Sequence, residues 1–150
     1  MNPGVSEIRR RIAAAVGDAL DPVRESVFHP KLIGFDGGGI AGAFYSVEAL
    51  QTVPADPRNR VTTRTGPAGG GVYARSTFAI RYLHRIKADA QVASYDAALD
   101  VELALLTSIA AVDYSGTGSL DVQSIDREVL ADGAWVLITL VGRVAHVIEA

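Results

Sequence analysis

Apolar residues recur at helical spacing in two segments of the chain. In the first segment Ser6 is a suitable N-cap, and Asp21-Pro22 ends the run. Its apolar positions are Ile8, Ile12, Ala15 or Val16, and Ala19. The spacing predicts an amphipathic helix. The three arginines at 9–11 lie off the apolar stripe, on a solvated face or against an acidic partner.

The second helical segment, residues 90–111, is apolar on two sides. One stripe consists of Val92, Tyr95, Leu99, Leu103, Leu106 and Ala110, and the other consists of Ala98, Val101, Leu105 and Ile109. The sector that contains Asp96 and Asp100 is polar. A helix of this kind has two neighbours. They are the first helix and the sheet, or one of them is a neighbouring subunit.

Alternating or continuous apolar runs predict the strands. Residues 72–86 give the clearest pattern, with Phe78, Ile80 and Tyr82 on one face and Thr77 and Arg81 on the other. Shorter strands are expected at 27–35, interrupted by Pro30, and at 43–50 after a glycine turn. Residues 120–130 and 135–148 flank Asp-Gly at 132–133 and predict a hairpin.

The second arm of that hairpin, residues 135–148, is apolar on both faces and therefore needs cover on both sides. Gly142 marks a bend or bulge within it. Together the elements predict an α/β chain of the α+β type, with a mixed or antiparallel sheet flanked by two main helices. Residues 1–150 form one domain with a long loop or hairpin arm at about 53–71.

Charge changes this picture because it is segregated along the chain. Residues 57–88 carry six arginines and one lysine and no acid, whereas residues 89–150 carry ten acids and two arginines. The formal net charge of −3 therefore conceals two oppositely charged blocks. The chain has no cysteine, so neither a disulfide nor a thiolate metal site is possible. No apolar run reaches the length of about 20 residues that a membrane span needs.

Motifs that carry chemistry are missing. The glycines of 34–42 lack the lysine and Ser/Thr of a P-loop and the spacing of a dinucleotide fingerprint. Residues 113–124 match a calcium loop in part, but Ser124 stands where the bidentate glutamate belongs. The three histidines, at 29, 84 and 146, lack metal-ligand spacing. A spatial Ser-His-Asp triad stays open, and no nucleophile elbow is present. We expect no enzyme activity, no cofactor and no metal site.

The order of features resembles the tail-terminator proteins of long-tailed, non-contractile bacteriophages and related phage-like particles. The resemblance rests on FHPKLIGFDGGGIAGAFYSVEA, on the strand TFAIRYLHRI followed by the helix DAQVASYDAALDVELALLTSI, and on the hairpin DGAWVLITL. It spans most of the chain and is most specific at residues 77–106. These passages form a pattern of elements and contain no invariant motif.

The resemblance implies a small α/β virion subunit that forms a hexameric ring. Such a ring caps the completed tail tube, stops its polymerisation and meets the head-side connector, and DNA passes through its channel without sequence recognition. The implied partners are further copies of the chain, the tail tube protein and the connector protein. The implied location is the head–tail junction of a virion assembled in the host cytoplasm, without membrane contact.

A closed ring needs two different patches on each subunit, and the two charge blocks are suitable for them. The candidate interface or channel residues are Arg58, Arg60, Arg64, Arg81, Arg85, Asp96, Asp100, Val101 and Leu105. The basic loop contacts a neighbour's acids or lines the channel. Charge reversal of Arg58 and Arg64 together is expected to weaken the ring at moderate salt. Two alternatives stay open, another head–tail connector subunit and a small α/β ligand-binding domain.

Overall fold

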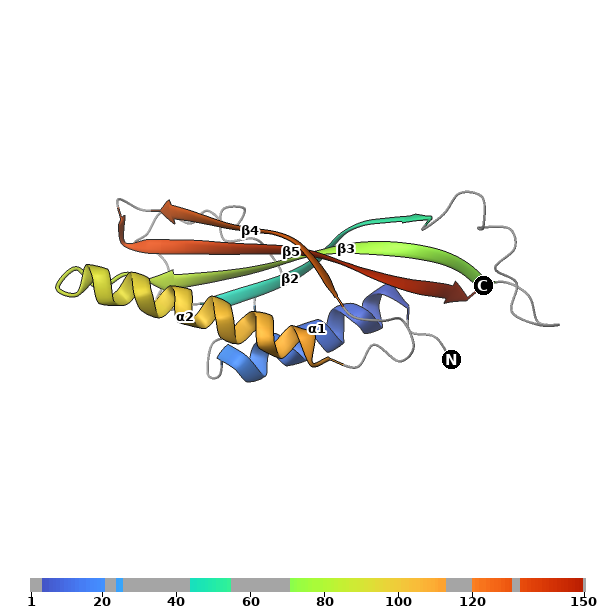
Figure 1. The fold of residues 1–150 in the computed structure, drawn as a ribbon, viewed down its shortest axis with the longest axis horizontal. Coiled ribbons are helices and arrows are strands. Elements are labelled where there is room, and N and C mark those ends of the chain that lie inside the picture. Colours follow the sequence, from blue (N-terminus) through green and yellow to red (C-terminus); the bar gives the residue numbers. More distant parts are fainter. Residues whose placement is uncertain are drawn as a thin grey trace.

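The computed structural model describes residues 4–20, 24–25, 44–54, 71–112, 120–130 and 133–149. Its helices are α1 (Val5–Leu20) and α2 (Gln91–Ala110). Its strands are β1 (Arg24–Glu25), β2 (Phe44–Pro54), β3 (Gly71–Arg85), β4 (Asp121–Leu130) and β5 (Trp135–Glu149). The strands form one sheet in the order β1-β2-β3-β5-β4, with β1 parallel to β2 and the other pairs antiparallel. The two helices lie together on one face of it (Figure 1). The predicted α+β fold is confirmed.

Helix α1 begins at Val5, two residues earlier than its sequence pattern suggests. The amide of Ile8 donates to the carbonyl of Gly4 at 3.0 Å, so Gly4 precedes the helix and Ser6 lies inside it. The prediction of Ser6 as N-cap is wrong. Ile8, Ile12 and Val16 are buried as expected, and Val16 rather than Ala15 is the core residue of its turn.

Strands β3 and β5 form the centre of the sheet. Every residue of β3, from Gly71 to Arg85, has a partner on β5, from Glu149 to Trp135. Phe78, Ile80 and Tyr82 share one face, as predicted. That face points to the helices, and the three residues share the core with even-numbered residues of β5. On the opposite face Leu83, Trp135 and Leu137 are also buried. The prediction that this arm is covered on both faces is therefore confirmed for its first half.

The predicted hairpin of β4 and β5 is present. Gly133 has a φ of 91°, a left-handed conformation that favours glycine in a tight turn. The predicted irregularity at Gly142 lies in the partner strand, where the β4 register shifts between Val122 and Ser124. Gly142 itself accommodates the side chain of Leu120, whose Cγ would lie 2.8 Å from an added Cβ.

Several predicted elements lie outside the described residues. They are the strand at 27–35, the glycine turn after it and most of the loop or arm at 53–71, although β2 extends to Pro54. The two-residue strand β1 has no counterpart among the predictions. None of the described helices is long and apolar enough to span a membrane.

Candidate functional site

The two apolar stripes of α2 have different surroundings. Ala98, Leu105 and Ile109 belong to the hydrophobic core, and Leu105 is only 1% exposed. The same side of α2 meets α1, where the hydroxyl of Ser108 donates to the carbonyl of Ala15 at 2.8 Å. One side of α2 thus contacts both the first helix and the sheet.

Leu105 is therefore not at a subunit interface, and that prediction is wrong. The sequence showed it as part of a second apolar stripe, but the chain's own core buries Ala98, Leu105 and Ile109 of this stripe. Val101 is half-buried and packs against the same core. Asp96 and Asp100 are exposed, as expected for an interaction surface.

The other stripe of α2 faces solvent. Val92 is 77% exposed and Leu103 65%, and Tyr95 is also exposed, whereas Leu99 and Leu106 are half-buried beside them. Large apolar side chains exposed singly are ordinary, but three on one flank of a single helix form a patch. This stripe had the cleaner helical spacing in the sequence, yet it is the one that the chain leaves uncovered.

Strand β4 continues this apolar flank. Val129 lies opposite Val136 and Ile125 opposite Leu140, so both point to the helix side of the sheet. Val129 is nevertheless 61% exposed and Ile125 half-buried, because α2 packs over β5 and β4 lies beyond it at the edge of the sheet. The end of β4 and the beginning of α2 lie at the same end of the molecule (Figure 1).

We call the exposed and half-buried apolar residues on this flank of α2 and β4 the α2–β4 surface. Its members are Val92, Tyr95, Leu99, Leu103, Leu106, Ile125 and Val129. An ion pair joins its two halves. Arg127 Nε donates to Glu102 Oε1 at 2.9 Å and Nη2 donates to Oε2 at 2.6 Å. The hydrogen bond to Glu102 is the main cause that raises the pKa of Arg127. Glu102 of α2 is only 8% exposed. Arg127 of the edge strand therefore supplies the counter-charge for a buried carboxylate of the helix.

The rim of the α2–β4 surface is acidic where α2 forms it, because this helix has no basic residue and exposes Asp96 and Asp100. The exposed Asp126 and Glu128 of β4 lie opposite Thr139 and Leu137, so they point to the sheet face away from the helices. The single arginine of these two elements is the one bound to Glu102. The surface therefore combines apolar area with negative charge.

The arginines of β3 lie on the other side of the molecule. Since Phe78, Ile80 and Tyr82 face the helices, the odd-numbered Arg75, Arg81 and Arg85 face away from them. Arg75 and Arg85 are exposed. We name these two exposed residues the arginine face. The other candidate arginines, Arg58, Arg60 and Arg64, lie outside the described residues.

Arg81 serves within the chain. Its Nη1 lies 2.8 Å from Glu48 Oε2 on β2, and its side chain is 17% exposed. The N–H bond does not point at this oxygen, so the contact is an ion pair without a well-aligned hydrogen bond. An arginine held this way by its own subunit is a poor candidate for an intersubunit contact.

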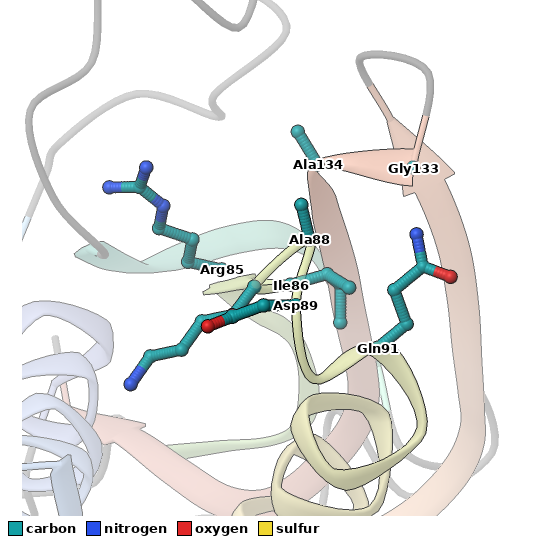
Figure 2. Close-up of a pocket in the computed structure, with 8 residues that line it drawn as sticks. Arg85, Ile86, Ala88, Asp89, Gln91, Gly133 and Ala134 are labelled. Carbon is teal, nitrogen blue, oxygen red and sulfur yellow. The ribbon is translucent and has the colours of Figure 1, made fainter.

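A hollow of about 540 Å³ lies where the β3–α2 turn meets the β4–β5 turn. Figure 2 shows Arg85 and Gln91 pointing to different sides of it. A ligand site needs polar groups that converge on one position. This hollow does not provide them.

A hydrogen-bonded chain of three side chains crosses the sheet. Thr52 Oγ1 lies 2.7 Å from Ser76 Oγ, which lies 2.7 Å from His146 Nε2. Ser76 is fully buried, and burial lowers the pKa of His146. The structure thus brings a serine and a histidine together, but no solvent or substrate reaches the hydroxyl. Only the sheet register aligns these residues, so no spacing in the sequence could have indicated them.

Tyr82 and His84 form a second contact of this kind, with the Tyr82 hydroxyl 2.8 Å from His84 Nδ1. Burial raises the pKa of Tyr82 and lowers that of His84. Among the described residues no group of three histidine or carboxylate side chains is placed to hold a metal ion.

No protein-family model matches the chain, and no curated protein matches it. Among solved structures, a chain of the virion of a native gene transfer agent particle is similar to it, with 17% sequence identity and a TM-score of 0.49. The match covers 94% of this chain and 92% of that chain. A similarity of this degree identifies neither a family nor a function.

Proposed function

We propose that the chain is a structural subunit of a phage-like virion, which forms a ring on the completed tail tube, stops its polymerisation and joins it to the head-side connector. The observation that carries the proposal is the exposed α2–β4 surface with its acidic rim. The resemblance to tail terminators is the reason for proposing a phage-like particle and a position at the end of its tail tube.

Exposed apolar side chains gathered on one flank favour association, because association removes them from water. Ser76, which the structure pairs with His146, is fully buried and does not reach a substrate. We therefore propose an assembly role and no catalytic one, with DNA passing through the ring without sequence recognition.

The test deletes the gene for this chain from the genome that encodes the particle. A terminator is required to stop tail growth, so the mutant is expected to produce tail tubes of uncontrolled length without heads, visible by electron microscopy. A plasmid copy of the wild-type gene is the control and should restore joined particles. Heads joined to tails of normal length in the mutant would contradict the proposal.

The same experiment separates the terminator from another head–tail connector. Loss of a connector leaves finished tails of normal length beside unattached heads, because tail growth is still stopped. The purified chain should also bind the ends of isolated tail tubes if it is a terminator, and isolated heads if it is a connector.

A further inference from the structure

We propose that Arg75, Arg143 and Asp121 form a binding site for inorganic phosphate on the face of the sheet away from the helices. The two guanidinium groups bind oxygens of the anion, and the carboxylate accepts a hydrogen bond from its protonated oxygen. The site lies apart from the α2–β4 surface, and the inference does not depend on the proposed ring.

The sheet register brings these three side chains together from three strands. Arg75 of β3 lies opposite Ala145 of β5. Arg143 of β5 lies opposite Thr77 of β3, two positions away. The two arginines are therefore diagonal neighbours on one face, about 7–8 Å apart, a separation that long side chains bridge. Asp121 of β4 lies directly opposite Arg143.

A hollow of about 220 Å³ lies between these side chains, and the small side chain of Ala145 forms part of its wall. Pockets for drug-sized organic ligands measure about 300–1,000 Å³. Three charged groups from three different strands border the hollow. Its size and its lining therefore fit a small ion that several polar groups bind at once.

The hydrogen bonding of Arg143 indicates that this ion is an anion. The Nε atom of Arg143 is buried and has no hydrogen-bond partner among the described residues. A buried donor without an acceptor destabilises the folded chain. The ion pairs found in the described part of the chain include neither Arg75 nor Arg143. An oxyanion between the two guanidinium groups supplies the missing acceptors and removes the repulsion between them.

Asp121 determines which oxyanion fits. Its Oδ2 accepts a hydrogen bond from Gln123 Nε2 at 2.7 Å, which leaves Oδ1 for a further donor. An ionised carboxylate only accepts hydrogen bonds, so it repels an anion whose oxygens all lack a proton. Inorganic phosphate keeps an O–H group at neutral pH and donates it to Asp121. Sulfate and the phosphodiester groups of DNA have no such proton, so the carboxylate favours inorganic phosphate over both.

The test is isothermal titration calorimetry of the full-length chain with sodium phosphate and with sodium sulfate, at pH 8 and equal ionic strength. We expect the wild type to bind phosphate at least about tenfold more tightly than sulfate, because only phosphate donates to Asp121. Methyl phosphate is the third ligand. The second pKa of a phosphate monoester is about 6, so methyl phosphate has no proton at pH 8 and should bind as weakly as sulfate.

Asp121→Asn should remove the preference for phosphate. The amide oxygen keeps the hydrogen bond from Gln123, and the amide NH₂ donates to an unprotonated oxygen of the anion. Sulfate should therefore bind this variant at least about tenfold more tightly than it binds the wild type. Asp126→Asn is the matched control, since Asp126 is an exposed acid of the same strand that points to the same face. It should keep the preference of the wild type.

Arg75→Gln and Arg143→Gln should each weaken the binding of phosphate at least about tenfold, because each removes a charged donor. Arg85→Gln is their control. It removes the other exposed arginine of β3, which lies outside this hollow, and should bind phosphate as the wild type does. Thermal unfolding of every variant without ligand shows whether it is folded.

Three results would overturn the inference. They are the absence of phosphate binding to the wild type, equal affinity of the wild type for phosphate and sulfate, and an Asp121→Asn variant that still discriminates against sulfate. If an arginine variant does not fold, the preference of the wild type and its loss in Asp121→Asn still decide the inference.

Discussion

The two sides of α2 are both apolar, and they differ in what covers them. On one side Ala98, Leu105 and Ile109 pack into the core, and on the other Val92 and Leu103 face water. The buried side is not the more hydrophobic one, since it includes Ser94 and Glu102. Hydrophobicity alone therefore does not decide which side of this helix packs on the sheet. Small residues, and a counter-charge on β4 for the one buried acid, allow the less apolar side to pack there.

The largest expected effect is a difference in stability between truncations on the two sides of α2. Leu105→Ala removes a fully buried side chain and should lower the free energy of unfolding by about 2–5 kcal/mol. Leu103→Ala truncates a side chain that is largely exposed, so it should change that free energy by less than about 0.5 kcal/mol. Urea unfolding at a concentration where the protein is monomeric measures both. Equal costs for the two leucines would refute the distinction between the sides.

The ion pair between α2 and β4 should have the next largest effect. Arg127→Ala leaves the Glu102 carboxylate, 8% exposed, without its bidentate partner. We expect a loss of about 1–3 kcal/mol, less than for a fully buried pair, because the Arg127 side chain is 40% exposed.

The double variant Glu102→Leu/Arg127→Leu is the control for this pair. It removes both charges, so it should recover most of the stability that Arg127→Ala loses. If Arg127→Ala is neutral in urea unfolding, the pair does not hold β4 to α2.

The smallest expected effect is a dependence of stability on pH. Burial lowers the pKa of His146 below its value in the unfolded chain, which is about 6.5. The unfolded state then binds the proton more readily, so stability is full above pH 6.5 and falls as the pH drops below it. The half-buried His84, whose pKa burial also lowers, contributes in the same direction.

His146→Gln should make the stability depend less on pH, and the remaining dependence should come from His84. The measurement is the thermal midpoint of wild type and variant between pH 5 and pH 8. Identical slopes for the two proteins would show that His146 is not buried as a neutral ring.

Much of the fold could be predicted from the sequence, because its signals are local. The alternation around Phe78 and Ile80, the Asp-Gly turn at 132–133 and the helical spacing of 90–111 each gave an element that the structure contains. The choice between the stripes of α2 could not be predicted in this way. It depends on Arg127 reaching Glu102 from a strand 25 residues further along the chain, a contact that no periodicity encodes.

For the candidate interface residues, too, the sequence indicates local features but does not show which side chains the fold buries. Asp96 and Asp100 were recognised because a charged sector between apolar stripes is visible in the sequence, and both are exposed. Leu105 was misplaced because a helical stripe does not say whether its partner belongs to the same subunit. Val129 was missed because its exposure follows from the place of β4 at the edge of the sheet.

The central claim is that the outer stripe of α2 is covered by a neighbouring copy. The most direct measurement is the native mass of wild type and Leu103→Asp in analytical ultracentrifugation, at the same concentration and salt. We predict that the wild type sediments with several times its subunit mass of 15.8 kDa and that the variant is a monomer with a wild-type circular dichroism spectrum. A variant that assembles to the wild-type mass would contradict the account.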